Sequence, residues 1–221
     1  MELLLFITLI CLTNIIIFTM YKIFKKRGLY FSLVLLNIIS FVMSFKIANI
    51  FQININLGII GIISSMSIIF IFLEKYKSKG LKELITINFY SGIIVSLLLT
   101  IMNFYVPIVT ETISINMVGT FQSNYKILIL YPLIILLSQY LSIKLYKLLS
   151  TLQKNTNLNI MITYIIVGIL YTVIMSILSY IKILDFSSSI FIGVSTYMIG
   201  LLIMSINLII IKYIANKKEE I

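Results

Sequence analysis

The sequence has no histidine, no tryptophan and a single cysteine, Cys11. A metal site built from several His or Cys ligands and an intramolecular disulfide are therefore excluded. Hydrolase chemistry that relies on a histidine base is excluded for the same reason. The nine glycines are scattered, and none begins the phosphate-binding pattern G-x-x-x-x-G-K-[ST]. We therefore expect neither an enzyme nor a cofactor-binding protein.

Charge is also scarce, since only 11% of the 221 residues are charged whereas 61% are hydrophobic. A soluble domain has about a quarter of its residues charged, and no soluble core of this size could hide so much apolar surface. A soluble enzyme, a disordered protein and a fibrous protein are excluded. The composition predicts an all-α, polytopic membrane bundle that forms one integral membrane domain over residues 1–221.

Seven apolar runs are long enough to span a bilayer, at 2–21, 29–45, 57–73, 84–106, 125–149, 160–181 and 189–213. The second run could extend to residue 50. The first run lacks a basic start and a cleavage site, so it is typical of an uncleaved span rather than a secretory signal. We expect residues 1–28 to form an extra N-terminal span with a basic loop, and residues 29–221 to form a six-helix transporter core.

The basic residues alternate between the two sides of this arrangement. Fourteen of the 17 Lys and Arg residues fall in connections one, three and five or near the C-terminal end, and the other three are Lys46, Lys126 and Lys182. Because cytoplasmic segments collect Lys and Arg, this pattern predicts an external N-terminus and a cytoplasmic C-terminus. The same pattern explains the net charge of +10, so this charge does not indicate nucleic-acid binding. We expect a multi-pass protein of the bacterial cytoplasmic (inner) membrane.

Neutral polar residues must carry any solute recognition, because no charged residue lies at the centre of a run. Ser67 follows Gly58, Gly61 and Ser64 at intervals of three, which suits close helix packing. Gln139 and Ser142 share one helix face, and the Gln139 amide needs either a neighbouring helix or a ligand. The sixth run adds Tyr164, Tyr171 and Thr172, and the fourth adds Asn88, Tyr90, Ser91 and Asn103. Packing and ligand contact both remain open for these groups.

Residues 21–146 resemble the vitamin uptake transporter family, which is also called the queuosine precursor transporter family. The resemblance rests on KIFKKRGLY, on Asn56-Leu57-Gly58, on IFLEKYKSKGLKELI and on LLSQYLSIKLYKLL. Glu74 and Tyr76 match the family's E-x-Y core, Ser138 and Gln139 match its S-Q pair, and Lys126 stands where the family has Arg. Phe70, Ser142 and Tyr171 replace acidic residues of the family, and Thr172 matches a family threonine. The chain is similar to a divergent member.

The resemblance implies import of a small flat metabolite, such as a 7-deazapurine precursor of queuosine or a related purine-like or vitamin-like compound. It implies a solute site between the third, fifth and sixth runs, lined by Ser67, Gln139, Ser142, Tyr171 and Thr172. The alternatives are the substrate-binding subunit of an ATPase-driven vitamin importer and a non-transporting membrane scaffold. The expected partners are the solute, the lipid bilayer, and a second copy or an ATPase module.

No ionisable group is expected deep in the membrane, and proton-driven carriers generally need one. We therefore do not expect proton-coupled transport. We expect facilitated diffusion or a partner ATPase. Glu74 and Lys126 are the candidates for a coupling residue or a loop anchor. For Glu74, its neighbours Lys75, Lys77 and Lys79 favour a salt-bridged loop anchor.

Overall fold

The computed structural model describes residues 2–44, 46–50, 52–102, 125–180 and 184–217, and the structural statements below concern these residues. They form the helices α1 (Glu2–Met43), α2 (Gly58–Lys75), α3 (Leu81–Met102), α5 (Tyr125–Leu152), α6 (Thr156–Tyr180) and α7 (Phe186–Asn216). A short hairpin of β1 (Ile47–Ile50) and β2 (Ile53–Asn56) follows α1. Six of the described helices are long and apolar enough to cross a membrane, which makes the chain an all-α, multi-pass membrane bundle.

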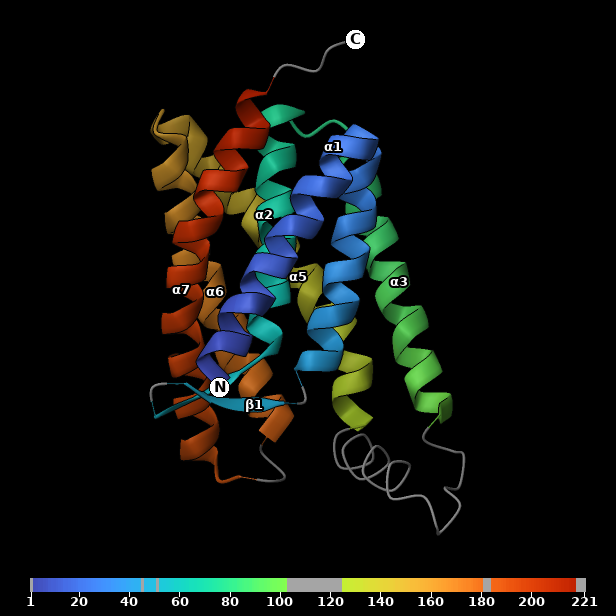
Figure 1. Cartoon of the computed structure of the whole chain (residues 1–221), viewed down its shortest axis with the longest axis vertical. Coiled ribbons are helices and arrows are strands. Elements are labelled where there is room, and N and C mark those ends of the chain that lie inside the picture. The colour runs from blue at the N-terminus through green and yellow to red at the C-terminus, as the bar shows by residue number, and fades with distance from the viewer. Residues whose placement is uncertain (1, 45, 51, 103–124, 181–183, 218–221) are drawn as a thin grey trace.

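α1 bends back on itself at Lys25, whose φ of 52° is left-handed. Glu2, at the start of this helix, accepts a hydrogen bond from the backbone N–H of Asn49, which lies just beyond its far end. Both ends of α1 therefore lie together, and α1 consists of a first arm (2–24) and a second arm (26–43), as Figure 1 shows. The expected run 2–21 lies in the first arm, and the expected run 29–45 lies in the second arm as far as Met43.

The hairpin corrects one expectation, because residues 47–50 form a strand and do not extend the second run as a helix. The two strands pair antiparallel, with Ile47 opposite Asn56 and Ile50 opposite Ile53. Alternating Ile and Asn suits a strand with one apolar face. Ile50 and Ile55 are buried, and the hairpin packs on α7 and on the end of α1.

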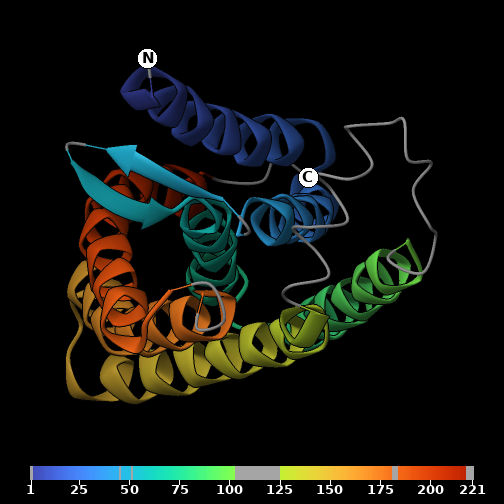
Figure 2. The ribbon, with the colours of Figure 1, turned by 90° about the horizontal axis from the view of Figure 1, so that it is seen from below.

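α2 lies in the middle of the bundle, with the arms of α1, α5, α6 and α7 around it and α3 at the outer edge (Figure 2). It can approach the second arm closely because Gly58 and Gly61 face that arm. A Cβ on Gly61 would stand 2.7 Å from the carbonyl oxygen of Leu36. This contact supports the packing interpretation of the small residues in α2.

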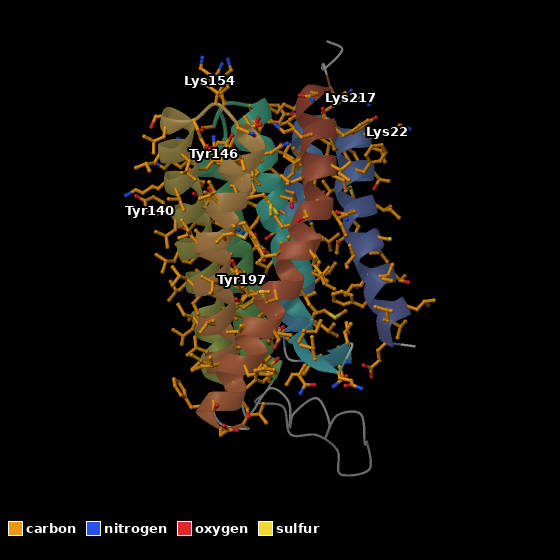
Figure 3. The ribbon with its side chains drawn as sticks, turned by 90° about the vertical axis from the view of Figure 1, so that its left-hand side faces the viewer. Lys22, Tyr140, Tyr146, Lys154, Tyr197 and Lys217 are labelled. Atoms are coloured by element: carbon orange, nitrogen blue, oxygen red, sulfur yellow. The ribbon has the colours of Figure 1, made fainter. Side chains whose placement is uncertain are left out.

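The two ends of the bundle differ in charge. The basic end carries Lys22, Lys154 and Lys217 (Figure 3), and the hairpin end carries β1, β2 and the N-terminus. Lys75 joins three elements at the basic end, because its Nζ donates to the Tyr21 hydroxyl and to the carbonyl oxygens of Ile214 and Lys217. The external loop expected at 107–124, the Lys182 position and the end of the run at 84–106 lie outside the described residues.

Candidate functional site

Three amide side chains meet where the second arm, α3 and α5 pack together. Asn37 Nδ2 donates to Asn88 Oδ1, and Asn88 Nδ2 donates to Gln139 Oε1 at 3.2 Å. All three side chains are buried. We call Asn37, Asn88 and Gln139 the amide cluster. Each comes from a different helix, so the cluster crosses the packing seams between these helices rather than lying along one.

The amide cluster is not fully hydrogen-bonded. Among the described residues, Asn37 Oδ1 and Gln139 Nε2 are buried without a hydrogen-bond partner. The cluster thus ends in a free acceptor at Asn37 and a free donor at Gln139. Buried polar groups in native structures nearly always have a partner, because leaving one without costs about 1–3 kcal/mol. A ligand that offers both a donor and an acceptor would satisfy both ends.

The cluster lies well inside the bundle. Gln139 is 14 residues from the first residue of α5 and 13 from its last. Asn88 is seven residues from the start of α3. At 1.5 Å per residue, these positions are about 10 Å or more from the helix ends at the basic end. The amides therefore stand where water does not compete for their hydrogen bonds.

Aromatic rings close one side of the cluster. The Tyr131 hydroxyl donates to the backbone carbonyl of Asn37 at 3.4 Å, and the rings of Tyr131 and Phe41 lie 4.3 Å apart between centroids. A cavity of about 20 Å³ remains between these rings, Asn37, Asn88 and the helix seam at Gly92. This volume suits a single water molecule, so the helices are closed around the amides.

A much larger groove of about 970 Å³ adjoins this cavity. It lies between the two arms of α1 and α3, and it shares Ile38 and Ser91 with the small cavity. Lys26, Arg27 and Glu83 stand at its basic end.

The five predicted site residues do not gather around one cavity. Gln139 belongs to the amide cluster, whereas Ser142 donates to the carbonyl of Ser138 in its own helix. Ser67 donates to the Ile63 carbonyl and accepts from Asn207 Nδ2 at 3.0 Å, so it faces α7.

Tyr171 and Thr172 line a second cavity of about 10 Å³ near the hairpin end, together with Asn56 and Thr196. Thr172 donates to the Gly168 carbonyl. Tyr171 is buried, and the phenol groups that interact with its hydroxyl are those of Tyr131 and Tyr164. Tyr131 therefore connects the surroundings of the two cavities.

Glu74 is an anchor whose partners differ from those expected. It accepts a hydrogen bond from the Tyr146 hydroxyl and forms an ion pair with Lys212 of α7 at 3.9 Å, rather than with the lysines of its own loop. Lys212 also donates to Thr156, so α2, α5, α6 and α7 are joined at the basic end. The Lys126 side chain lies outside the described part of the chain. Among the described residues, no group of three His, Cys, Asp or Glu could hold a metal ion.

Sequence reasoning missed Asn37 and Tyr131, and it noted Asn88 without a pattern to support it. The available signal was an amide side chain within each of three apolar runs, since Asn37, Asn88 and Gln139 all need partners outside their own helix. No protein-family model matches this chain, and neither a curated protein nor a solved structure matches it. A functional proposal therefore depends on the amide geometry and the sequence resemblance.

Proposed function

We propose that this chain is a membrane carrier for a small, flat, mostly neutral metabolite, with a 7-deazapurine precursor of queuosine as the leading candidate. The amide cluster is its solute site. The supporting observation is the free donor of Gln139 and the free acceptor of Asn37 in the buried interior. The sequence resemblance to queuosine precursor transporters supports the same solute class.

The chemistry of the cluster suits such a ring. A guanine-like edge presents N–H donors beside a carbonyl acceptor, and a side-chain amide offers both complements. Phe41 and Tyr131 present flat aromatic faces on which a heterocycle can stack. Three amides can thereby take over recognition that carboxylates carry in the family, at positions now occupied by Phe70, Ser142 and Tyr171.

Binding requires the helices to separate, because the present cavity of about 20 Å³ is far smaller than a purine-sized ligand needs. α3 is the element that moves. It lies at the edge of the bundle with most of its surface exposed, and it contacts mainly α1 and α5. Moving α3 outward would open the seam that holds Asn88.

We further infer seven membrane crossings, with the two arms of α1 as the first two. The basic end is cytoplasmic and the hairpin end external in the bacterial inner membrane. The support is the concentration of Lys and Arg at one end of the bundle.

Transport is not proton-coupled in this proposal, and the chain is not an enzyme. Within the described helices, the charged residues lie towards the helix ends or at the bend of α1, and Glu74 is paired with Lys212. Facilitated diffusion or a partner ATPase drives uptake. The alternative is that the chain is the substrate-binding subunit of an ATPase-driven importer, with the ATPase module at the basic cytoplasmic end.

The test is uptake of a labelled 7-deazapurine panel into proteoliposomes, by wild-type protein and by Asn88→Leu. We expect equilibration to equal concentrations with wild-type protein, unaffected by an imposed pH gradient, and little uptake with Asn88→Leu. Asn207→Leu is the matched control, because it removes a buried amide from the α2–α7 seam and should leave uptake intact.

Equal uptake by Asn88→Leu and Asn207→Leu would contradict the assignment of the site. If wild-type protein takes up no compound, either with or without an imposed pH gradient, the chain is not a carrier that works alone. Accumulation that follows the pH gradient and disappears in Glu74→Gln would contradict the uncoupled mechanism.

A further inference from the structure

The large groove beside the amide cluster has an unusual distribution of residues along its length. It lies between the arms of α1 and α3 and is walled by apolar side chains, among them Phe31, Leu35 and Ile87. Its charged residues, Lys26, Arg27 and Glu83, all stand at the basic end. We call this feature the arm groove. Its polar end and apolar body match an amphiphile rather than a small polar solute.

The depth of the arm groove matches one leaflet. The second arm lines it from Arg27 through Phe31 and Leu35 to Ile38, at the spacing of one helix face. Ile38 lies eleven positions beyond Arg27, and eleven rises of 1.5 Å span about 16 Å. Half of a hydrocarbon core of about 30 Å is about 15 Å. A chain with its polar head at Arg27 would therefore end near the bilayer midplane, beside Ile38.

The arm groove is accessible from the side of the bundle. Phe31 is 64% exposed, Ile87 42% and Leu35 39%, and all three belong to the outer surface of the second arm and α3. In a bilayer, this surface faces lipid. An occupant can enter laterally from the leaflet, without passing through water.

The charges at the mouth favour an anion. Arg27 is exposed, and Lys26 lies 5.5 Å from the ring centre of Tyr76 with its ammonium group directed to the loop between α2 and α3. Glu83 is the acid at this mouth, and it accepts a hydrogen bond from the Tyr30 hydroxyl at 3.1 Å. The cations outnumber the acid, and Lys22, Lys25 and Lys82 lie nearby in the sequence. Arg presents a fork of donors that suits a phosphate.

We propose that the arm groove binds one anionic phospholipid of the leaflet at the basic end. Its phosphate contacts Arg27 and Lys26, and one acyl chain lies along Phe31, Leu35 and Ile87. The chain end reaches Ile38 and Ser91, which also border the small cavity over the amide cluster. The bound chain thereby closes that cavity towards the hydrocarbon. This proposal is independent of the solute, since it rests on the groove alone.

The experiment counts bound lipids by native mass spectrometry after exchange into mixed micelles of dioleoyl phosphatidylglycerol or dioleoyl phosphatidylcholine. We expect one retained phosphatidylglycerol and weaker retention of phosphatidylcholine. Arg27→Gln should weaken phosphatidylglycerol binding about fivefold, because each basic residue near an anionic surface contributes about 1 kcal/mol. Leu35→Trp should abolish retention by filling the groove with a bulky ring. Glycerol phosphate alone should not compete, because it lacks the acyl chain.

Lys154→Gln is the matched control, since it removes a cation from the same end but from the turn between α5 and α6. Equal losses in Arg27→Gln and Lys154→Gln would show general surface attraction and overturn the proposal. So would normal phosphatidylglycerol retention in Leu35→Trp, or competition by glycerol phosphate. A dimer that Leu35→Trp dissociates would show a second copy in the groove instead of lipid.

Discussion

At the scale of single residues, Asn56 holds the hairpin end together. Its Nδ2 donates to the Ser44 carbonyl and to the Tyr180 hydroxyl, and its Oδ1 accepts from the Gly58 N–H. Its backbone N–H donates to Thr196. We predict that Asn56→Leu lowers the free energy of unfolding by about 1–3 kcal/mol, because several buried partners lose their bonds. Unfolding in mixed detergent measures this change.

The control for this prediction is Asn49→Leu in the opposite strand. Asn49 is exposed, and its amide donates a hydrogen bond to Asn54 Oδ1 across the hairpin. Equal destabilisation by the two substitutions would contradict the role given to Asn56.

Asp185 gives a residue-scale prediction about pH. It caps α7, and hydrogen bonds from the side chain and backbone of Ser188 lower the pKa of Asp185 below its ordinary value of 3.8. Because the pKa of Asp185 is lower in the folded protein than its ordinary value, the carboxylate stabilises the fold fully when the pH is above that ordinary value. This stabilisation is lost as the pH falls through the folded-state pKa. We predict faster amide exchange at the start of α7 below about pH 4. Asp185→Asn should keep the cap but lose the pH dependence. Persistence of the dependence in that variant would assign it to another group.

The polar residues also show how far sequence could predict the site. Ser67, Ser142 and Thr172 each donate to a carbonyl of their own helix four residues earlier. Such hydroxyls need no partner elsewhere, so their positions say little about a site. An Asn or Gln amide has two donors and an acceptor, and it must reach another helix. Gln139 stands out in the sequence for this reason, and the same rule applies to Asn37.

At the scale of elements, the contact between α2 and the second arm depends on glycine. A Cβ on Gly61 would lie 2.7 Å from the Leu36 carbonyl oxygen and 3.0 Å from Ser40 Cα, and neither backbone atom can rotate away. We predict that Gly61→Ala destabilises the protein by about 1–3 kcal/mol. Gly92→Ala is the control, because its nearest neighbour is Pro132 Cβ at 3.3 Å. Loss of thermal stability in Gly92→Ala but not in Gly61→Ala would contradict this account of the packing.

Hydrophobic runs predict helices well and their connections poorly. The described parts of the expected runs lie in helices except for a residue at the end of two runs, because about 20 apolar residues without a breaker have no other stable form in lipid. The bend at Lys25 lies in the basic connection expected after the first run, but this connection is helical on both sides of the bend instead of forming a loop. The hairpin was not predicted, because its four-residue strands of Ile and Asn resemble the end of a longer run.

At the scale of the whole molecule, the charge difference between the ends predicts an orientation. In a Cys11→Ser background, Lys154→Cys should react with a membrane-impermeant maleimide only after cells are opened. Asn49→Cys, which is exposed at the hairpin end, should react in intact cells. The physical reason is the retention of Lys-rich and Arg-rich segments on the cytoplasmic side. The opposite labelling pattern would reverse the inferred topology.

The central claim is that the amide cluster binds a solute instead of only joining helices. The most direct measurement is the thermal stability of wild-type protein and Gln139→Leu, each with and without a 7-deazapurine panel. Gln139 Nε2 has no hydrogen-bond partner among the described residues. Replacing this amide therefore removes one unpaired group, while Asn88 Nδ2 loses its acceptor. The stability without ligand should therefore stay within about 1 kcal/mol of wild type.

Ligand should raise the melting temperature of wild-type protein by mass action, and this increase should vanish in Gln139→Leu. A variant that is strongly destabilised yet keeps the full ligand-dependent increase, or a wild type with no increase, would contradict the claim.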